Sequence, residues 1–106
     1  MSYRWPNKDP DETLDYSIDW SRFLGEGVSI SSVEWYVDNA SGVKTLIAGG
    51  ETVNSIQNVS QTNTSTVATI NIGSGTNNVD YKFSCRVTDN SGSQAERVVK
   101  LRIKER

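Results

Sequence analysis

The feature that most constrains this fold is a run of alternating residues in the last third of the chain. Between residues 81 and 87, the side chains of Tyr81, Phe83, Cys85 and Val87 alternate with polar ones. A β-strand directs successive side chains to opposite faces of its sheet, so this spacing predicts a strand with one buried face. No segment of useful length has the helical spacing, and the chain is therefore predicted to be all-β.

The same alternation recurs along the chain and predicts about seven short strands. They cover residues 14–21, 29–37, 44–48, 52–57, 66–72, 81–87 and 94–104. Turns rich in glycine, asparagine and serine separate them, and the Gly49-Gly50 pair between two of the runs predicts a tight hairpin. Short strands with polar turns at regular spacing are typical of two antiparallel sheets packed face to face.

The length of 106 residues is enough for one domain with its own core and too small for two. Trp35 is placed to fill the centre of a sandwich, and Tyr81 begins a strand, where its hydroxyl is expected to bond back to the chain. These positions favour a single immunoglobulin-like sandwich over residues 14–106. Cys85 is the one cysteine, so no internal disulfide forms, and we expect an inert, buried thiol.

Residues 1–13 differ from the rest and predict an extended N-terminal arm. Pro6 and Pro10 lack a backbone N–H, and each pushes the residue before it to extended geometry. Such an arm is poorly suited to join a sheet, and it loses little conformational entropy when it orders on a partner. Two interpretations of Trp5 stay open: an anchor in a partner protein, or a lid folded over the end of the sandwich.

The residue types exclude the common kinds of catalytic site. The chain has no histidine, which removes the usual general base and every Ser–His or Cys–His pair, so we predict that it is not an enzyme. Acidic residues crowd the arm and the first strand, at Asp9, Asp11, Glu12, Asp15 and Asp19. Their spacing does not match an EF-hand, and a solvated face is favoured over a calcium site. We expect no metal ion and no cofactor.

The charge distribution points away from nucleic acid and membranes. The net charge is −2, and the apolar runs are too short to span a bilayer. Lys100, Arg102, Lys104 and Arg106 nevertheless form a basic stripe on the last strand. Three interpretations stay open: protection of an edge strand against aggregation, pairing with acidic residues of the first strand, or complementarity to an acidic partner.

An ordered set of short motifs resembles a known family. They are Arg4-Trp5-Pro6, Lys8-Asp9-Pro10-Asp11, Leu14-Asp15-Tyr16, Asp19-Trp20, Leu24-Gly25, Trp35, Cys85-Arg86-Val87 and Glu96-Arg97. Together they resemble small tailed-phage proteins described as fibre–tail adaptor or neck proteins, which have an immunoglobulin-like sandwich. The resemblance implies a non-enzymatic virion protein at the head–tail or tail–fibre junction, made in the cytoplasm of the bacterial host. The implied partners are portal, tail, fibre or capsid proteins, bound by several copies around a symmetry axis.

These considerations predict which side chains contact a partner. Aromatic and arginine side chains dominate the energetics of protein interfaces. The predicted contacts are Tyr3, Arg4, Trp5, Asp9 and Asp11 in the arm, and Lys100, Arg102 and Lys104 on the last strand. Two other functions stay open: a capsid decoration or cement protein, and a carbohydrate-binding module for host attachment. Tyr36 beside Asp38 and Asn39 is the local candidate for a carbohydrate site.

Overall fold

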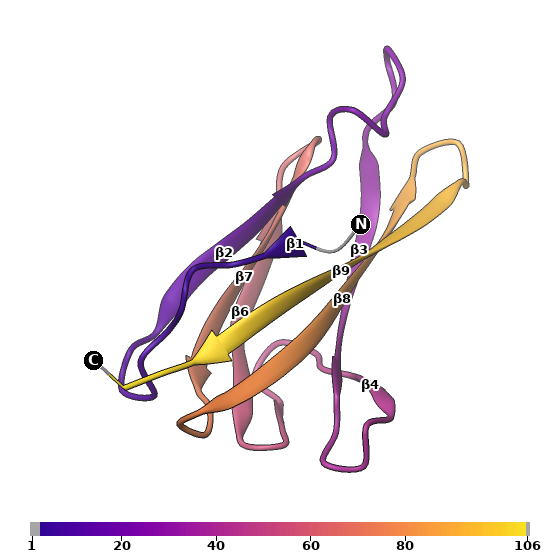
Figure 1. Cartoon of the computed structure of the whole chain (residues 1–106). Coiled ribbons are helices and arrows are strands. Elements are labelled where there is room, and N and C mark those ends of the chain that lie inside the picture. Colours follow the sequence, from indigo (N-terminus) through magenta and orange to yellow (C-terminus); the bar gives the residue numbers. More distant parts are fainter. Residues whose placement is uncertain (1–2, 106) are drawn as a thin grey trace.

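The computed structural model describes residues 3–105, with side chains described from Arg4 onward. Nine strands in this range form two sheets that pack face to face, which confirms the all-β prediction and the two-sheet sandwich (Figure 1). Within the same range there is no helix with the length and apolarity to cross a membrane.

The first sheet has the strand order β1-β9-β8-β3-β4. Its strands are β1 (Tyr3–Arg4), β9 (Gln94–Ile103), β8 (Val79–Asp89), β3 (Ile30–Asp38) and β4 (Lys44–Leu46). Four of these strands are antiparallel to their neighbours, and β1 adds a short parallel strand beside β9.

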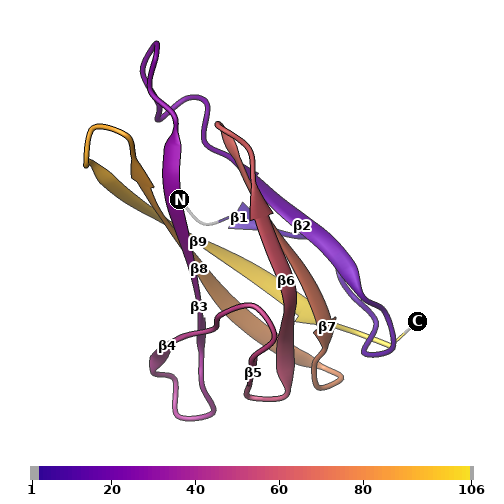
Figure 2. The same cartoon turned by 180° about the vertical axis from the view of Figure 1, so that it is seen from behind.

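The second sheet has the order β2-β7-β6-β5 and is antiparallel throughout. Its strands are β2 (Leu14–Asp19), β7 (Val67–Ser74), β6 (Ile56–Asn63) and β5 (Thr52–Val53). The view from behind shows this sheet in front of the first (Figure 2).

The core lies between the two inner faces, where the alternating apolar residues meet. Trp35 and Phe83 of the first sheet are each 1% exposed, and Ile70 of the second is fully buried. Cys85 is also fully buried, as predicted, and burial raises the pKa of its thiol to about 12. The thiol is therefore protonated at neutral pH and packs as a small apolar side chain.

The Tyr81 hydroxyl bonds back to the chain as predicted. It donates to the carbonyl of Asn54 at 2.9 Å and accepts the backbone N–H of Thr76 at 2.9 Å. Asn54 lies in the turn between β5 and β6, so the hydroxyl joins the start of β8 in one sheet to a turn of the other. The ring itself is 2% exposed, and both hydrogen bonds satisfy an otherwise buried polar atom.

The predicted hairpin at Gly49-Gly50 is wrong. β4 belongs to the first sheet and β5 to the second, so these glycines lie where the chain crosses between sheets. The buried Asn58 side chain, which donates to the Ile47 carbonyl at 3.0 Å, holds this crossing against β6. A long-range contact of this kind leaves no mark in the local pattern of residues.

The tight hairpin lies at Asn54-Ser55 instead. Both residues have positive φ, 50° and 68°, and they connect Val53 and Ile56, which pair across the hairpin. Two successive residues with positive φ are what a two-residue hairpin turn of type I′ requires, and asparagine tolerates this conformation better than most residues. The strand predicted at 52–57 is therefore two strands, and β6 continues to Asn63 through residues where no strand was expected.

Candidate functional site

The proline-containing arm joins the first sheet, which corrects the expectation that it was poorly suited to do so. β1 runs parallel to β9, as Figure 1 shows. Beyond it, the N–H groups of Trp5 and Lys8 donate to the carbonyls of Lys100 and Arg102 at 2.9 and 3.0 Å. A proline removes only its own N–H, and the donors are Trp5 before the first proline and Lys8 between the two.

Trp5 lies in the core between the two sheets, and not as a lid over the end of the sandwich. Its side chain is 8% exposed and stacks on Tyr16 with ring centroids 4.8 Å apart. The rings of Trp35 and Phe83 lie 5.9 and 5.8 Å away, and the indole N–H donates to the Ser17 carbonyl at 3.4 Å. The expectation of an exposed anchor is corrected accordingly, because almost none of this side chain is on the surface.

Lys8 is a second buried residue of the arm, and the predicted site did not include it. Its side chain is fully buried, and Nζ donates to the carbonyls of Ser74 at 2.6 Å and Asp9 at 2.9 Å. Burial lowers the pKa of Lys8, and the carboxylates of Glu12, Asp9 and Asp11 oppose that shift. The ammonium group thus ties the arm to the end of β7. Sequence patterns could not find it, because lysine is almost never fully buried.

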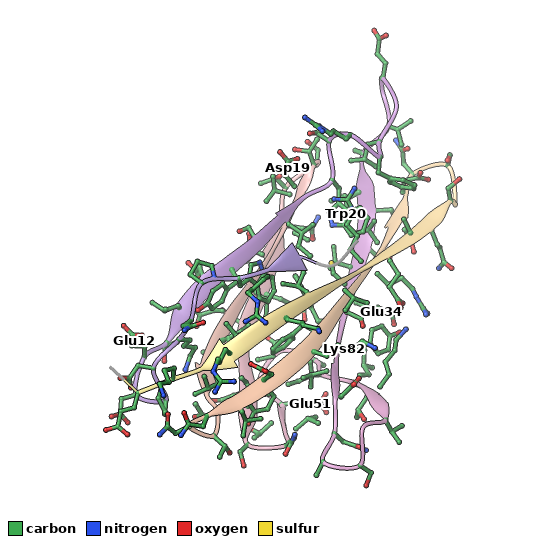
Figure 3. The ribbon with its side chains drawn as sticks, viewed as in Figure 1. Glu12, Asp19, Trp20, Glu34, Glu51 and Lys82 are labelled. Carbon is green, nitrogen blue, oxygen red and sulfur yellow. The ribbon has the colours of Figure 1, made fainter. Side chains whose placement is uncertain are left out.

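Asp9 and Asp11 lie in the turn between the arm and β2. The Asp9 carboxylate accepts the Asp11 N–H at 2.8 Å, and the Glu12 carboxylate accepts the Asp9 N–H at 2.9 Å. Figure 3 labels Glu12 at this end of the molecule and Asp19 at the other. Asp9 and Asp11 are therefore separated from Arg4 by the length of the arm. Between residues 3 and 105, no group of three or more carboxylate, thiol or imidazole side chains is placed to hold a metal ion.

The structure places Arg4 and Lys100, two predicted contacts from opposite ends of the chain, side by side. Arg4 is the register partner of Lys100, and Lys100 is the register partner of Lys82 on β8. Register partners lie on the same face, so three exposed basic side chains stand next to one another across β1, β9 and β8. We call Arg4, Lys82 and Lys100 the basic row. None of the three forms an ion pair within the described part of the chain.

The other two predicted contacts at this end of the chain, Arg102 on β9 and Lys104 just after it, each contact a residue of the fold. Arg102 forms an ion pair with Asp80 at 3.1 Å, and Lys104 Nζ donates to the Asn78 side chain at 3.1 Å. The carboxylate that pairs with Arg102 thus comes from β8 and not from the first long strand. Arg106 and the side chain of Tyr3 lie outside the described residues, although the backbone of Tyr3 pairs with Val99.

A groove opens between β2 and the middle of β9, beside β1. It encloses about 360 Å³, and the buried side chains of Trp5, Ile18 and Val99 contribute to its lining. The charged side chains in the lining are Arg4, Arg22, Arg97 and Asp19. We call this feature the arginine groove, and Arg4 belongs both to it and to the basic row.

Asp19 and Arg97 are held by local contacts at the arginine groove. The backbone N–H of Ser21, which donates to Asp19 at 2.9 Å, is the main cause that lowers the pKa of Asp19, and Arg22 and Arg97 lower it further. The Arg97 guanidinium lies over the ring of Trp20 at 4.8 Å. Figure 3 labels Asp19 and Trp20 at the same end of the sandwich.

Tyr36 does not present the open aromatic face that a sugar would stack on. Lys44 Nζ lies 4.7 Å from its ring centroid, the Arg86 guanidinium lies 5.3 Å from it, and Glu96 pairs with both cations at 2.7 and 3.1 Å. These contacts lower the pKa of Glu96, the hydrogen bond from Lys44 being the largest cause. The Asn39 side chain, for its part, accepts two backbone N–H groups of its own loop.

Comparison with known proteins identifies the family. A family model described as "Podophage GP4 fiber-tail adaptor protein gp77" matches residues 8–102, which include every strand except β1 and the last residue of β9. A search of curated proteins found no match. The matched family consists of structural proteins of the virion tail. The chain therefore belongs to the Gp77 family of podophage fibre–tail adaptors, non-enzymatic proteins of the virion that join tail and fibre.

Proposed function

We propose that this adaptor docks on an acidic surface of a tail or fibre protein through the basic row. The observation that carries the proposal is the row itself. Like charges directly opposite one another destabilise a sheet, by an amount on the order of a few tenths of a kcal/mol for each pair. Carboxylates of a partner would relieve this repulsion, and charge complementarity of this kind mainly supplies specificity and rapid association.

The arm supports docking by holding Arg4 in the row. Lys8 and Trp5 fix the arm to the sandwich, and β1 sets the register that brings Arg4 next to Lys100. We propose that residues 1–13 act as a positioning segment on a sandwich formed by residues 14–106. Tyr3, Asp9 and Asp11 stay predicted contacts, as do Arg102 and Lys104 beside the row.

We also propose that the sandwich is of the immunoglobulin type. Three observations support this assignment: Trp35 at the centre, the Tyr81 hydroxyl bonded back to the chain, and a short first strand parallel to the last one. Such a domain is a rigid support, and several copies around the axis of the tail would strengthen modest single contacts through multivalency. Contacts with portal or capsid proteins stay predictions of the same kind.

The test is direct binding of the purified chain to the purified tail and fibre proteins of the same phage, measured by biolayer interferometry at several salt concentrations. The double variant Lys82→Gln with Lys100→Gln is expected to bind roughly tenfold more weakly and with a weaker dependence on salt. Lys44→Gln removes one positive charge that is not part of the row and serves as the control. Unchanged binding of the double variant would contradict the proposal.

A further inference from the structure

β2 is an edge strand whose outer backbone groups pair with no second strand among the described residues. It pairs only with β7 among the described strands. The Trp20 N–H donates toward the β7 side, whereas the Ser17 carbonyl accepts the Trp5 indole on the opposite side. In an antiparallel ladder the N–H and C=O of one residue point to the same side, and that side alternates along the strand. Asp15, Ser17 and Asp19 therefore direct their N–H and C=O groups to the outer edge.

The arm shows how an extended segment occupies this edge of the sandwich. It runs beside β9, and after a turn the chain comes back next to it as β2 (Figures 1 and 2). Its Pro6 carbonyl accepts the Tyr16 hydroxyl at 3.2 Å, and its Trp5 side chain enters the core. The arginine groove continues this track, because its lining passes from Trp5 to residues 17–19 and on to Arg22. An apolar lining at the groove is suited to another inserted side chain.

The charges around the groove select the kind of segment that fits. Three arginines line it against one carboxylate, Asp19, which already accepts the Ser21 N–H. Arg4 and Arg22 are exposed and form no ion pair within residues 3–105. A guanidinium group can bind a carboxylate through two parallel hydrogen bonds, which makes arginine the preferred side chain for recognising acidic groups.

We infer that the arginine groove binds an extended, acidic segment of a tail or fibre protein, which adds as a strand to the free edge of β2. Carboxylates of the segment pair with Arg4, Arg22 and Arg97, and an apolar side chain between them enters the groove. This is strand addition at a sheet edge, in which backbone hydrogen bonds supply affinity and side-chain pockets supply specificity. The inference rests on the proposed function and names the segment that the adaptor recognises.

Overlapping 12-residue peptides from the tail and fibre proteins of the same phage test the inference, with binding to the full chain followed by fluorescence anisotropy. Binding is expected only for peptides that alternate acidic and apolar residues, and replacing their carboxylates by amides should abolish it. Arg22→Gln should weaken binding about tenfold, as expected for one lost hydrogen bond to a charged group. Lys44→Gln is the matched control, because it removes one positive charge that belongs neither to the arginine groove nor to the basic row.

Hydrogen exchange measured by NMR tests strand addition itself. The amides of Asp15, Ser17 and Asp19 are expected to exchange more slowly when the peptide is bound, because each gains a carbonyl partner. Peptide binding without this protection, or binding unaffected by Arg22→Gln, would overturn the inference. Protection of the same amides without peptide, together with a dimer in sedimentation, would also overturn it by identifying a second copy as the occupant.

The intact tail and fibre proteins separate the two proposals. Binding of an intact partner that depends on Lys82 and Lys100, with no peptide bound, would reject the groove and keep the basic row. The opposite result would reject the basic row and keep the groove. In that case peptide binding depends on Arg22, and the intact partners bind the Lys82 and Lys100 variants as well as they bind the wild type. Absence of binding by every intact partner and every peptide would reject both.

Discussion

The N-terminal arm and strand β9 lie side by side, and both were predicted to contact a partner. On β9 the alternation held: Val99, Leu101 and Ile103 are buried, while Lys100 is exposed. In the arm the two residues that matter most for packing, Trp5 and Lys8, turned inward. The difference teaches that a regular pattern reports which face of a strand is buried, whereas the composition of an irregular segment does not report what it packs against.

The largest expected effect is that of Trp5→Ala on stability. Removing a buried aromatic side chain leaves a cavity and costs about 3–5 kcal/mol in the free energy of unfolding. Chemical denaturation of the free protein measures it. Phe23→Ala is the control, since Phe23 is 38% exposed, and its cost is expected to stay below about 1 kcal/mol. Equal costs for the two variants would mean that the arm is not part of the core.

The next largest effect on stability is expected for Lys8, and its dependence on pH tests whether the ammonium group is buried. Lys8→Ala is expected to cost about 1–3 kcal/mol, because the carbonyls of Ser74 and Asp9 lose their donor. The pKa of Lys8 is lowered in the folded state, so the folded protein binds fewer protons than the unfolded chain between that pKa and the usual 10.5.

The free energy of unfolding contributed by Lys8 therefore rises with pH across that window. Urea denaturation of the wild type and of Lys8→Met, compared over this range, isolates the effect. Lys8→Met retains most of the length of the side chain and has no group to titrate. A difference between the two proteins that does not change with pH would show that Lys8 is solvated.

A smaller effect is expected for Glu96 on β9. Its pKa is lowered by Lys44 and Arg86, so its contribution to stability is complete above the usual value of 4.5 and is lost as the pH falls through the lowered pKa. Glu96→Gln should cost less than about 1 kcal/mol at neutral pH, because the pair is partly exposed. The free energy of unfolding of Glu96→Gln should also fall less between neutral and acidic pH than that of the wild type. An unchanged pH dependence would contradict a stabilising pairing of Glu96 with Lys44 and Arg86.

The smallest effect has the opposite sign and is specific to the basic row. Lys100→Gln is expected to stabilise the free protein by a few tenths of a kcal/mol at low salt, because it removes repulsion from both Arg4 and Lys82. Adding salt should erase the gain by screening the charges. A loss of stability instead would indicate that other groups of the protein already offset the repulsion among the three basic side chains. A gain in stability combined with weaker partner binding is the expected outcome.

Much of the fold could be predicted because most of its strands alternate. The ends of β2, β3 and β8 lay within a few residues of the predicted limits, since apolar side chains recur there every second position. The prediction failed in the middle of the chain because the polar strand β6 has only a weak alternation of apolar and polar residues. Its sheet assignment depends on the buried Asn58 and on the turn at Asn54-Ser55.

The candidate site could be predicted only in part. Arg4 and Lys100 were expected to contact a partner for separate reasons, but their adjacency needed the parallel pairing of β1 with β9. Lys82, Arg22 and Arg97 were missed because isolated basic residues on strands and loops carry no local signal. They can be recognised as parts of a site only in the fold, which brings them together with few carboxylates nearby.

The sequence by itself determined the all-β class, the buried faces of the long strands and the absence of histidine chemistry. These follow from residue type and from a two-residue period, which are local properties of the chain. Only the tertiary structure decided that the arm pairs with β9, that Trp5 and Lys8 are buried, and that three arginines line one groove. These features join residues far apart in the chain, and their energies come from contacts that no local pattern encodes.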